Sequence, residues 1–306
     1  MHIRQHTLKR SYIFEGKGLH TGRISRMAIN PAPEGAGIRF CRTDKGGVII
    51  EALADYVTST ARSTTIEKDG VAVITIEHLM SALYGLGVDN AFIEINGDEV
   101  PILDGSAKPY IDAISADGLM EQEALREYYN LDEEIHVTDA ERGSEIIFYP
   151  SPETSFDVTV DYNSKVLGVQ TAHWDPAIDY ACEVGTCRTF VFFHEIAFLF
   201  SKNLIKGGDV DNAIVIVEHP VVQDELDRMA ALFNMPRLVR NPDGYLNNVV
   251  LRYPNECARH KLLDLMGDLA LVGRRVKARV VATRPGHGIN TKAARILRGK
   301  ILNDNK

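Results

Sequence analysis

The sequence predicts an α+β protein built from two domains of similar plan. Its 306 residues exceed the length of about 150 residues that is typical of one domain. Apolar periodicity indicates the same order twice along the chain: strands, a helix, a further strand and a second helix. The charged stretch at residues 121–134 has the composition of a domain junction, so we place the domains at residues 1–128 and 129–306.

Strands precede helices in the first domain. Residues 11–42 alternate around Gly and Pro, which predicts short antiparallel strands. The period then becomes helical at three leucines spaced i, i+4 and i+7, which are Leu79, Leu83 and Leu86. Gly87 ends this helix, residues 91–95 predict a strand, and residues 108–117 predict a second helix.

The second domain begins with strand-like alternation over residues 135–160. Further short strands are predicted at residues 213–217 and 276–283. Helices are predicted at residues 192–203, 256–272 and 291–302. The middle helix has Asn255 at its N-cap position and Gly273 as its stop.

The composition is that of an ordinary folded protein. Apolar residues make up 45% of the chain, enough for a sizeable core and too many for a disordered chain. The 34 basic and 42 acidic residues give a formal net charge of −8. This charge argues against a dedicated nucleic-acid binder, because such proteins carry a basic face. A local basic patch for an acidic substrate stays compatible with it.

The cysteines and the apolar runs predict the compartment. The four cysteines have no regular spacing, which indicates the reduced thiols of a cytosolic protein. Residues 1–18 contain no apolar core of a signal peptide, and no apolar run is long enough to span a bilayer. We therefore expect a cytoplasmic protein that does not insert into membranes.

On a helix, the patterns H-x-x-x-D and H-x-x-x-H can present two metal ligands on one face. Two such pairs occur among the ten histidines, His2 with His6 and His260 with Asp264. The first pair lies at the chain terminus, where fraying makes a poor site. The second lies inside a predicted helix, and Asp268 extends the same stripe.

The stripe of His260, Asp264 and Asp268 has two interpretations. An amphipathic helix with a solvated polar face is the commoner origin of such a pattern. However, Leu265 and Leu271 widen the apolar face and predict a largely buried helix. Buried His and Asp side chains need a cation or a network of partners, so the metal site and the ordinary helix are about equally supported.

The dipeptide Glu77-His78 stands where the strand predicted at residues 71–76 passes into a helix. At such a turn both side chains can point into one cleft, with His as a metal ligand and Glu as the general base beside a bound water. The chain contains a second such dipeptide, Glu218-His219, which Pro220 follows. The dipeptide alone therefore decides nothing.

His287 stands between two glycines after a predicted strand. Such a residue is most often an exposed loop residue; the alternative is a mobile general acid at the end of a strand. Residues 16–22 are rich in glycine but lack the P-loop spacing, and no G-x-G-x-x-G opens a helix after a strand. The sequence thus excludes these two nucleotide-binding motifs.

Seven blocks of sequence follow one another in the order of a known family. They are Gly-Lys-Gly-Leu-His-Thr-Gly at 16–22, Thr-Ile-Glu-His-Leu at 75–79, Leu-Asp-Gly-Ser-Ala at 103–107, Arg-Thr-Phe at 188–190, Gly207-Gly208 with Asp211 and residues 213–215, the stretch 259–269, and Gly-His-Gly-Ile-Asn-Thr-Lys at 286–292. With these blocks the chain resembles the zinc-dependent UDP-3-O-acyl-N-acetylglucosamine deacetylases. The resemblance spans nearly the whole chain.

The resemblance implies a fold and a reaction. Each half would have a mainly antiparallel sheet with two helices, and the helices of both halves would be sandwiched between the sheets. The reaction would remove the acetyl group from the 2-acetamido nitrogen of UDP-3-O-acyl-N-acetylglucosamine, giving the free amine and acetate, the committed step of lipid A biosynthesis in a Gram-negative bacterium. One catalytic Zn²⁺ would be required, with Fe²⁺ as an alternative ion for such a site. We expect a monomer without a nucleic-acid partner.

The resemblance also implies roles for individual residues. The zinc ligands would be His78, His260 and Asp264. The catalytic residues would be Glu77 as base, His287 as the second acid–base group, Thr189 at the oxyanion, and Asp268 as the partner that orients His287. Substrate contacts would come from Lys261, Phe190 and His20, and a passage for the acyl chain from Phe192, Ile196 and Phe200. Simple core packing is nearly as well supported for the last three.

One departure from the family and two rival classes also follow from the sequence. Many family members carry a Cys near the metal site where this chain has Ser63. A non-catalytic sugar-nucleotide or lipid-binding protein would be expected to have lost Glu77 or His287, and a zinc peptidase would carry an H-E-x-x-H helix. The sequence leaves open the acyl length and whether His287 or Glu77 protonates the leaving amine.

Overall fold

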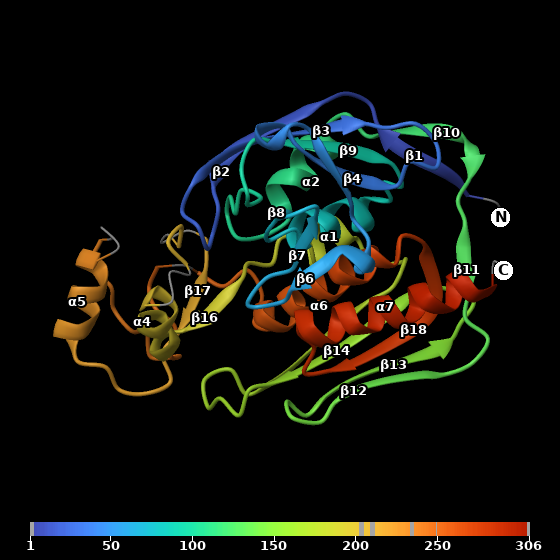
Figure 1. Cartoon of the computed structure of the whole chain (residues 1–306). Helices are drawn as coiled ribbons and strands as arrows, with labels where there is room; N and C mark the ends of the chain where they lie inside the picture. Colours follow the sequence, from blue (N-terminus) through green and yellow to red (C-terminus); the bar gives the residue numbers. More distant parts are fainter. Residues whose placement is uncertain (1–2, 202–204, 209–211, 233–235, 249, 305–306) are drawn as a thin grey trace.

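Two sheets face each other across a layer of helices (Figure 1). The computed structural model describes residues 3–304 except 202–204, 209–211, 233–235 and 249. The helices between the sheets are α1 (Glu77–Leu86), α2 (Lys108–Ser115), α6 (Glu256–Leu269) and α7 (His287–Asp304). This arrangement confirms the predicted α+β fold, with the helices between the sheets.

The first sheet comes from the early part of the chain. Its strand order is β2 (Tyr12–Lys17), β3 (Ile24–Pro31), β9 (Ala91–Ile95), β4 (Ile38–Arg42) and β5 (Val48–Glu51). Neighbouring strands are antiparallel except β4 and β9, which are parallel. Alternate residues of β9 are buried, because one face of this sheet packs on the core.

The second sheet comes from the later part of the chain. Its strand order is β12 (Ile135–Asp139), β13 (Ser144–Pro150), β18 (Arg275–Thr283), β14 (Ser155–Asp161) and β15 (Val169–Trp174), and β11 (Tyr128–Asn130) also pairs with β18. β18 runs antiparallel to β13 and parallel to β14 and β11. Its alternate residues Val276, Ala278, Val280 and Ala282 are buried.

Smaller elements surround the two sheets. A three-stranded sheet contains β6 (Val57–Ser59), β7 (Thr65–Lys68) and β8 (Val71–Val73), which leads into α1. Short 3₁₀ helices lie at Thr43–Lys45, Ala54–Tyr56 and Ala270–Val272, and a one-turn helix, α3, lies at Tyr180–Glu183. The last of the 3₁₀ helices continues α6 up to Gly273, the predicted stop.

Two strands occupy much of the stretch at residues 121–134 that the sequence predicts as a linker. β10 (Leu119–Leu125) pairs with β1 (Arg4–Leu8), and β11 pairs with β18 of the second sheet. Two of the charged side chains that suggested a linker, Glu121 and Glu123, lie at exposed positions of β10. The stretch is therefore bonded to both parts of the molecule, and the domain boundary at residue 128 stays a prediction.

Helix α7 begins at His287, whereas the sequence predicts its start at residue 291. The expectation that Gly286-His287-Gly288 forms a loop is therefore wrong for His287 itself. The backbone N–H of Asn290 donates to the carbonyl of Gly286 over 2.9 Å and closes the first turn. Gly288 and Thr291 are weak helix formers, so the sequence pattern did not predict this first turn.

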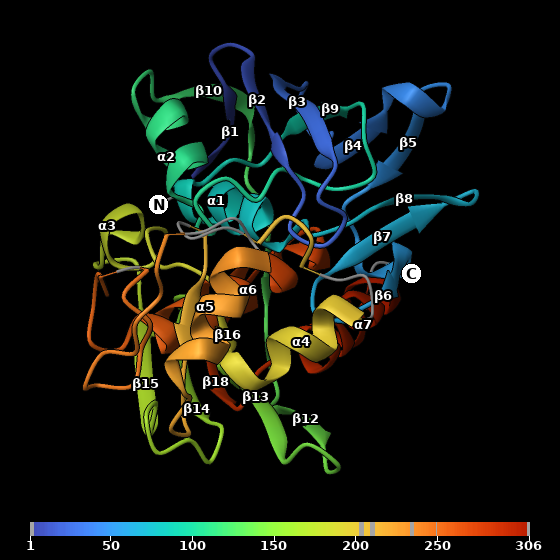
Figure 2. The same cartoon turned by 90° about the vertical axis from the view of Figure 1, so that its left-hand side faces the viewer.

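An insert, defined here as residues 190–246, projects from one side of the sandwich (Figure 1), and Figure 2 shows it from that side. It contains β16 (Phe190–Phe192), α4 (Phe193–Ser201), β17 (Ile214–Ile216) and α5 (Gln223–Leu232). The predicted helix at 192–203 and strand at 213–217 correspond to α4 and β17; α5 was not predicted. The insert has an apolar cluster of its own that includes Phe193, Ile196, Val215, Leu226 and Leu246.

The main core fills the space between the two sheets. It includes large side chains without exposed surface from both halves, such as Phe40, Leu79, Leu262 and Leu263. α1 and α6 lie at its centre. Among the described residues, no helix has both the length and the apolar character needed to cross a membrane.

Candidate metal and catalytic site

The turn before α1 aims two polar residues into the interior. Thr75 adopts a positive φ of 59°, which is uncommon for a β-branched residue and is found where the surroundings enforce it. Its hydroxyl donates to Glu99 Oε1 over 2.8 Å. α1 then begins at Glu77 and His78, and both side chains are buried.

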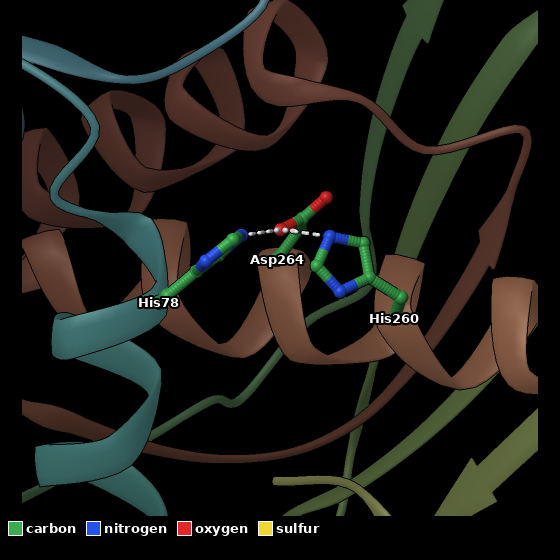
Figure 3. Close-up of side chains that lie close together, drawn as sticks. All are labelled: His78, His260 and Asp264. Atoms are coloured by element: carbon green, nitrogen blue, oxygen red, sulfur yellow. Dashed lines mark ion pairs between the residues drawn. The ribbon is translucent and has the colours of Figure 1, made fainter. Parts of the chain in front are cut away.

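A close approach between α1 and α6 brings the two helices' polar residues together. A Cβ atom at Gly267 would lie 2.1 Å from the carbonyl oxygen of Glu77, which is far inside van der Waals contact. Only glycine therefore fits here. The contact lets His78 on α1 reach His260 and Asp264 on α6 (Figure 3).

His78, His260 and Asp264 form a buried cluster in which one ligand atom from each lies within 4.8 Å of the others. His78 Nε2 and His260 Nε2 lie 3.6 and 3.4 Å from Asp264 Oδ1. This oxygen is buried and has no hydrogen-bond partner among the described residues. Two imidazole nitrogens and one carboxylate oxygen around an unsatisfied position fit a divalent metal ion.

Further contacts orient these side chains. His260 Nδ1 lies 3.0 Å from the carbonyl oxygen of Cys187, which directs its Nε2 toward Asp264. Lys261 Nζ donates to Asp264 Oδ2 over 2.5 Å and lies 5.4 Å above the ring of Phe190. Lys261 therefore lies at the edge of the cluster, beside an aromatic wall.

Burial and neighbouring charges set the protonation of the candidate ligands. It lowers the pKa of His78 to about 3, and it also lowers the pKa of His260. Burial alone would raise the pKa of Asp264, but the nearby His260 and Lys261 hold it well below its usual range. Neutral imidazoles and an ionised carboxylate are the forms that bind metal ions.

Glu77 lies beside the cluster in a position suited to accept a proton. Its Oε2 accepts a hydrogen bond of 3.0 Å from the backbone N–H of Thr64, and its Oε1 lies 3.7 Å from His287 Nε2. Burial raises the pKa of Glu77 to about 7, although His287 opposes the rise. A carboxyl group with a pKa near neutrality is an effective general base.

His287 and Asp268 form the second polar pair of the site. His287 Nδ1 lies 2.9 Å from Asp268 Oδ2. Burial alone would lower the pKa of His287, but Asp268 and Glu77 raise it to about 9. His287 is therefore an imidazolium that faces Glu77 through its Nε2.

Two residues without a predicted role hold Asp268 in place. Asn290 Nδ2 donates to Asp268 Oδ2 over 2.9 Å, and the Thr64 hydroxyl donates to Oδ1 over 2.5 Å. Asn290 follows His287 in the block at 286–292, which could have pointed to it. Thr64 is 204 residues away from Asp268, and no sequence pattern links the two.

An apolar cavity of about 120 Å³ opens next to the cluster, between the insert and the loop at 16–22. Its walls include His20, Thr189, Phe190 and Ile196. His20 is buried, and neither of its ring nitrogens has a hydrogen-bond partner among the described residues. The predicted substrate residues His20 and Phe190 and the predicted oxyanion residue Thr189 thus meet in one cavity.

The predicted acyl-passage residues separate in the structure. Ile196 lines the cavity. Phe192 instead packs with Leu167, Ile214 and Tyr245 in another cluster, on the opposite face of β16 from Val191, since side chains alternate along a strand. The side chain of Phe200 lies outside the described part of the structure.

Comparisons with known proteins show the family of the chain. A family model described as UDP-3-O-acyl N-acetylglycosamine deacetylase (LpxC) matches residues 5–233 and 234–298. The bifunctional enzyme LpxC/FabZ of Porphyromonas gingivalis is 47% identical over 299 residues, which cover 97% of this chain and 65% of that protein. The chain thus spans about two thirds of the length of such bifunctional relatives.

Shorter relatives are covered more fully. The UDP-3-O-acyl-N-acetylglucosamine deacetylase of Saccharophagus degradans is 40% identical over 297 residues, covering 95% of this chain and 89% of that protein. The protein of the same name from Myxococcus xanthus is 37% identical over 302 residues, covering 98% and 87%. On its matched length and these identities, the chain belongs to the UDP-3-O-acyl-N-acetylglucosamine deacetylase family.

Proposed function

We propose that this chain is a Zn²⁺-dependent hydrolase that removes the acetyl group from the 2-acetamido nitrogen of UDP-3-O-acyl-N-acetylglucosamine. The products are the free amine and acetate, and the reaction is the committed step of lipid A biosynthesis. The observation that carries the proposal is the unsatisfied buried oxygen of Asp264 between two imidazoles, with Glu77 and His287 beside it. Family membership supports the substrate.

His78, His260 and Asp264 would hold the ion. Two nitrogen ligands and one oxygen ligand suit Zn²⁺, and three protein ligands leave a coordination position open, as in catalytic zinc sites. Fe²⁺ suits the same donors and is the alternative outcome of metal analysis. When bound, the ion supplies Lewis-acid polarisation of the amide carbonyl and of the attacking water.

The protein's own residues would move the protons. Glu77 accepts a proton from the attacking water while the water oxygen forms a bond to the acetamide carbon. The Thr189 hydroxyl donates a hydrogen bond to the oxygen that gains negative charge. The C–N bond then breaks, and the imidazolium of His287 supplies the proton that the leaving nitrogen requires. Asp268 keeps His287 in the protonated form that this step needs.

Substrate binding would use both sides of the cluster. The acyl chain enters the apolar cavity beside Ile196, and Lys261 meets the diphosphate as a positive charge. His20 and Phe190 line the cavity, and the ring centroid of Phe190 lies 6.4 Å from that of His260. A binding protein without activity would have no use for the adjacent Glu77 and His287, so the structure favours the enzyme.

The proposal includes a monomer in the cytoplasm of a Gram-negative bacterium. Four cysteines without a disulfide, one of them the exposed Cys182, are typical of a reducing compartment. Sedimentation of the purified protein and fractionation of the cells that produce it test these two points. A dimer at micromolar concentration, or recovery outside the cytoplasm, would contradict them.

The deciding experiment measures acetate release from UDP-3-O-acyl-N-acetylglucosamine by zinc-loaded protein, with and without a chelator. Wild type is expected to turn over and to lose activity with the chelator. Glu77→Ala should lower kcat by about 10²–10⁴-fold, the usual contribution of a general base, while it keeps its metal. No turnover by zinc-loaded wild type would sink the proposed function.

A further inference from the structure

A buried ion pair joins the start of α6 to the segment that carries Thr189. Arg188 Nε lies 2.9 Å from Glu256 Oε1, and Arg188 Nη2 lies 3.2 Å from Glu256 Oε2. The two side chains are 8% and 0% exposed. Neither residue belongs to the metal cluster, and neither takes part in the proposed proton transfers.

The carboxylate of Glu256 also accepts from two backbone groups. The N–H of Arg188 donates to Oε1 over 3.0 Å, and the N–H of Arg252 donates to Oε2 over 2.6 Å. Arg188 Nη2 in turn donates to the carbonyl of Val250 over 2.6 Å. An apolar pair could be equally stabilising, but it could not fix these backbone segments on α6.

α6 makes a second contact with the segment of Arg188, one helical turn after Glu256. Glu256 and His260 are four residues apart and lie on one face of the helix. His260 Nδ1 contacts the carbonyl of Cys187, the residue before Arg188. The backbone group that orients a candidate metal ligand is therefore adjacent to the residue that the ion pair fixes.

The Leu-Asp-Gly-Ser-Ala block at 103–107 holds the segment from its other side. The N–H of Thr189 donates to the carbonyl of Gly105 over 2.8 Å. Gly105 has a φ of +78°, and a Cβ there would lie 1.8 Å from the backbone oxygen of Asn212. Asp104 accepts from Arg252 Nη2 over 3.1 Å, which links this block to Glu256 through Arg252.

We propose that the Arg188–Glu256 pair is a positioning device for the deacetylation. It sets the Cys187 carbonyl against the imidazole of His260, and it sets the Thr189 hydroxyl relative to the ligands on α6. The part that concerns Thr189 rests on the proposed function, whereas the part that concerns His260 is a statement about metal binding alone.

The test begins with Glu256→Gln, which keeps the side-chain size but removes the charge and one acceptor. Zn²⁺ affinity is measured by competition with a chromophoric chelator. We expect Zn²⁺ affinity to fall about 10–100-fold, and kcat by a similar factor, as for other residues that orient a metal ligand. KM should stay within about threefold, because the pair acts on the reacting centre and not on substrate binding.

The matched control is Asp89→Asn. Asp89 and Arg126 also form a two-bonded pair, with both N–O distances 2.8 Å and side chains 14% and 10% exposed, and Asp89 also accepts from the N–H of His6. This pair lies beyond the far end of α1 from Glu77. Asp89→Asn should lower Tm without changing Zn²⁺ affinity or kcat.

A double-mutant cycle with Thr189→Ala separates positioning from general stability. If the pair acts through Thr189, adding Glu256→Gln to Thr189→Ala should lower kcat much less than Glu256→Gln lowers it in wild type. Arg188→Lys, which keeps the charge but loses the two-bonded fork, replaces Glu256→Gln if that variant does not fold. Arg188→Lys should likewise lower Zn²⁺ affinity and kcat.

The outcomes are distinct. Wild-type Zn²⁺ affinity and kcat in Glu256→Gln, or an equal loss of affinity in Asp89→Asn, would overturn the proposal. Two results would overturn the part that concerns Thr189. They are a weakened Zn²⁺ affinity with wild-type kcat in Glu256→Gln, and additive losses of kcat in the double-mutant cycle. Absence of turnover in zinc-loaded wild type would contradict the proposed function only, since the affinity measurements would still decide the role of the pair toward His260.

Discussion

The polar cluster between α1 and α6 and the apolar cavity of the insert lie side by side but are built in opposite ways. In the cluster, His260 and Asp264 have specific hydrogen-bond partners, and the second oxygen of Asp264 faces the candidate metal position, so that few substitutions are compatible with it. In the cavity, side chains such as Ile196 and Val215 provide volume and apolar surface, and volume-conserving exchanges are tolerated. The proposed catalytic function therefore depends on the identity of individual residues, whereas the proposed acyl site depends on the volume and apolar surface of its walls.

Among the substitutions that test this contrast, Gly267→Ala is expected to have the largest effect, because it widens the contact between α1 and α6 that assembles the polar cluster. In Gly267→Ala the new Cβ would overlap the Glu77 carbonyl oxygen, at 2.1 Å, so α1 and α6 must separate. A misplacement of about 1 Å can cost roughly 10²-fold in rate, and overpacking costs about 1–3 kcal/mol of stability. Acetate release and urea denaturation measure the two effects.

Gly299→Ala is the matched control for this substitution. Gly299 lies within α7, and a Cβ there would have no described atom within 4 Å. Alanine should raise the free energy of unfolding by about 0.5–1 kcal/mol, with unchanged activity. If Gly267→Ala behaved like Gly299→Ala, the close approach of α1 and α6 would not be what assembles the cluster.

The contrast between the cluster and the cavity also explains what the sequence could predict. α1 and α6 have strong helical periods, and His78, His260 and Asp264 stand in blocks that resemble a known family. The structure brings these three residues together as expected. Their exact roles stay predictions, but their proximity follows from two periodic helices and one glycine contact.

The sequence could not predict the partners that hold these residues. Arg188 and Glu256 are 68 residues apart, and Thr64 and Asp268 are 204 apart, so nothing local links them. Such pairs exist only once the chain has folded. Phe192 shows a different limit: the helical pattern placed it with Ile196, but the residue belongs to β16, and strand alternation turns it to the other face.

A smaller effect, on KM, is expected from a substitution in the wall of the cavity. Ile196→Val removes one methylene from its wall, which is worth about 0.8 kcal/mol of apolar contact. KM for a long-chain substrate should rise about fourfold, whereas kcat stays within about twofold because the polar cluster is untouched. Steady-state kinetics with long-chain and short-chain acyl substrates checks this, since the short-chain KM should not change.

Phe192→Leu is the control for the cavity. Phe192 packs with Leu167, Ile214 and Tyr245 and not in the cavity, so this substitution should lower stability without changing KM for either substrate. A larger change in KM for Phe192→Leu than for Ile196→Val would show that the acyl chain uses the other face of β16. The cavity beside Thr189 would then not be the passage.

The smallest expected effect is on the free energy of unfolding and concerns His173, a surface histidine that contacts Asp carboxylates as His287 does. His173 lies 2.7 Å from Asp157 Oδ1 and 3.3 Å from Asp175 Oδ2, but it is 47% exposed. Burial opposes its charge, but the hydrogen bonds to Asp157 and Asp175 together raise its pKa above the ordinary value. His173 and His287 are thus an exposed and a buried histidine that each contact an Asp carboxylate.

The raised pKa predicts the sign of the pH dependence. A folded-state pKa above the unfolded value of about 6.5 means that His173 contributes its full stability below that pH and loses it as the pH rises through the folded value. His173→Gln should therefore lower the free energy of unfolding at pH 5.5 by less than about 1 kcal/mol, since the pair is screened by solvent, and should leave it unchanged at pH 9. Urea denaturation at both pH values measures this. An equal loss at both would mean that His173 contributes by packing and not by charge, and that the exposed pair is no electrostatic counterpart of His287 and Asp268.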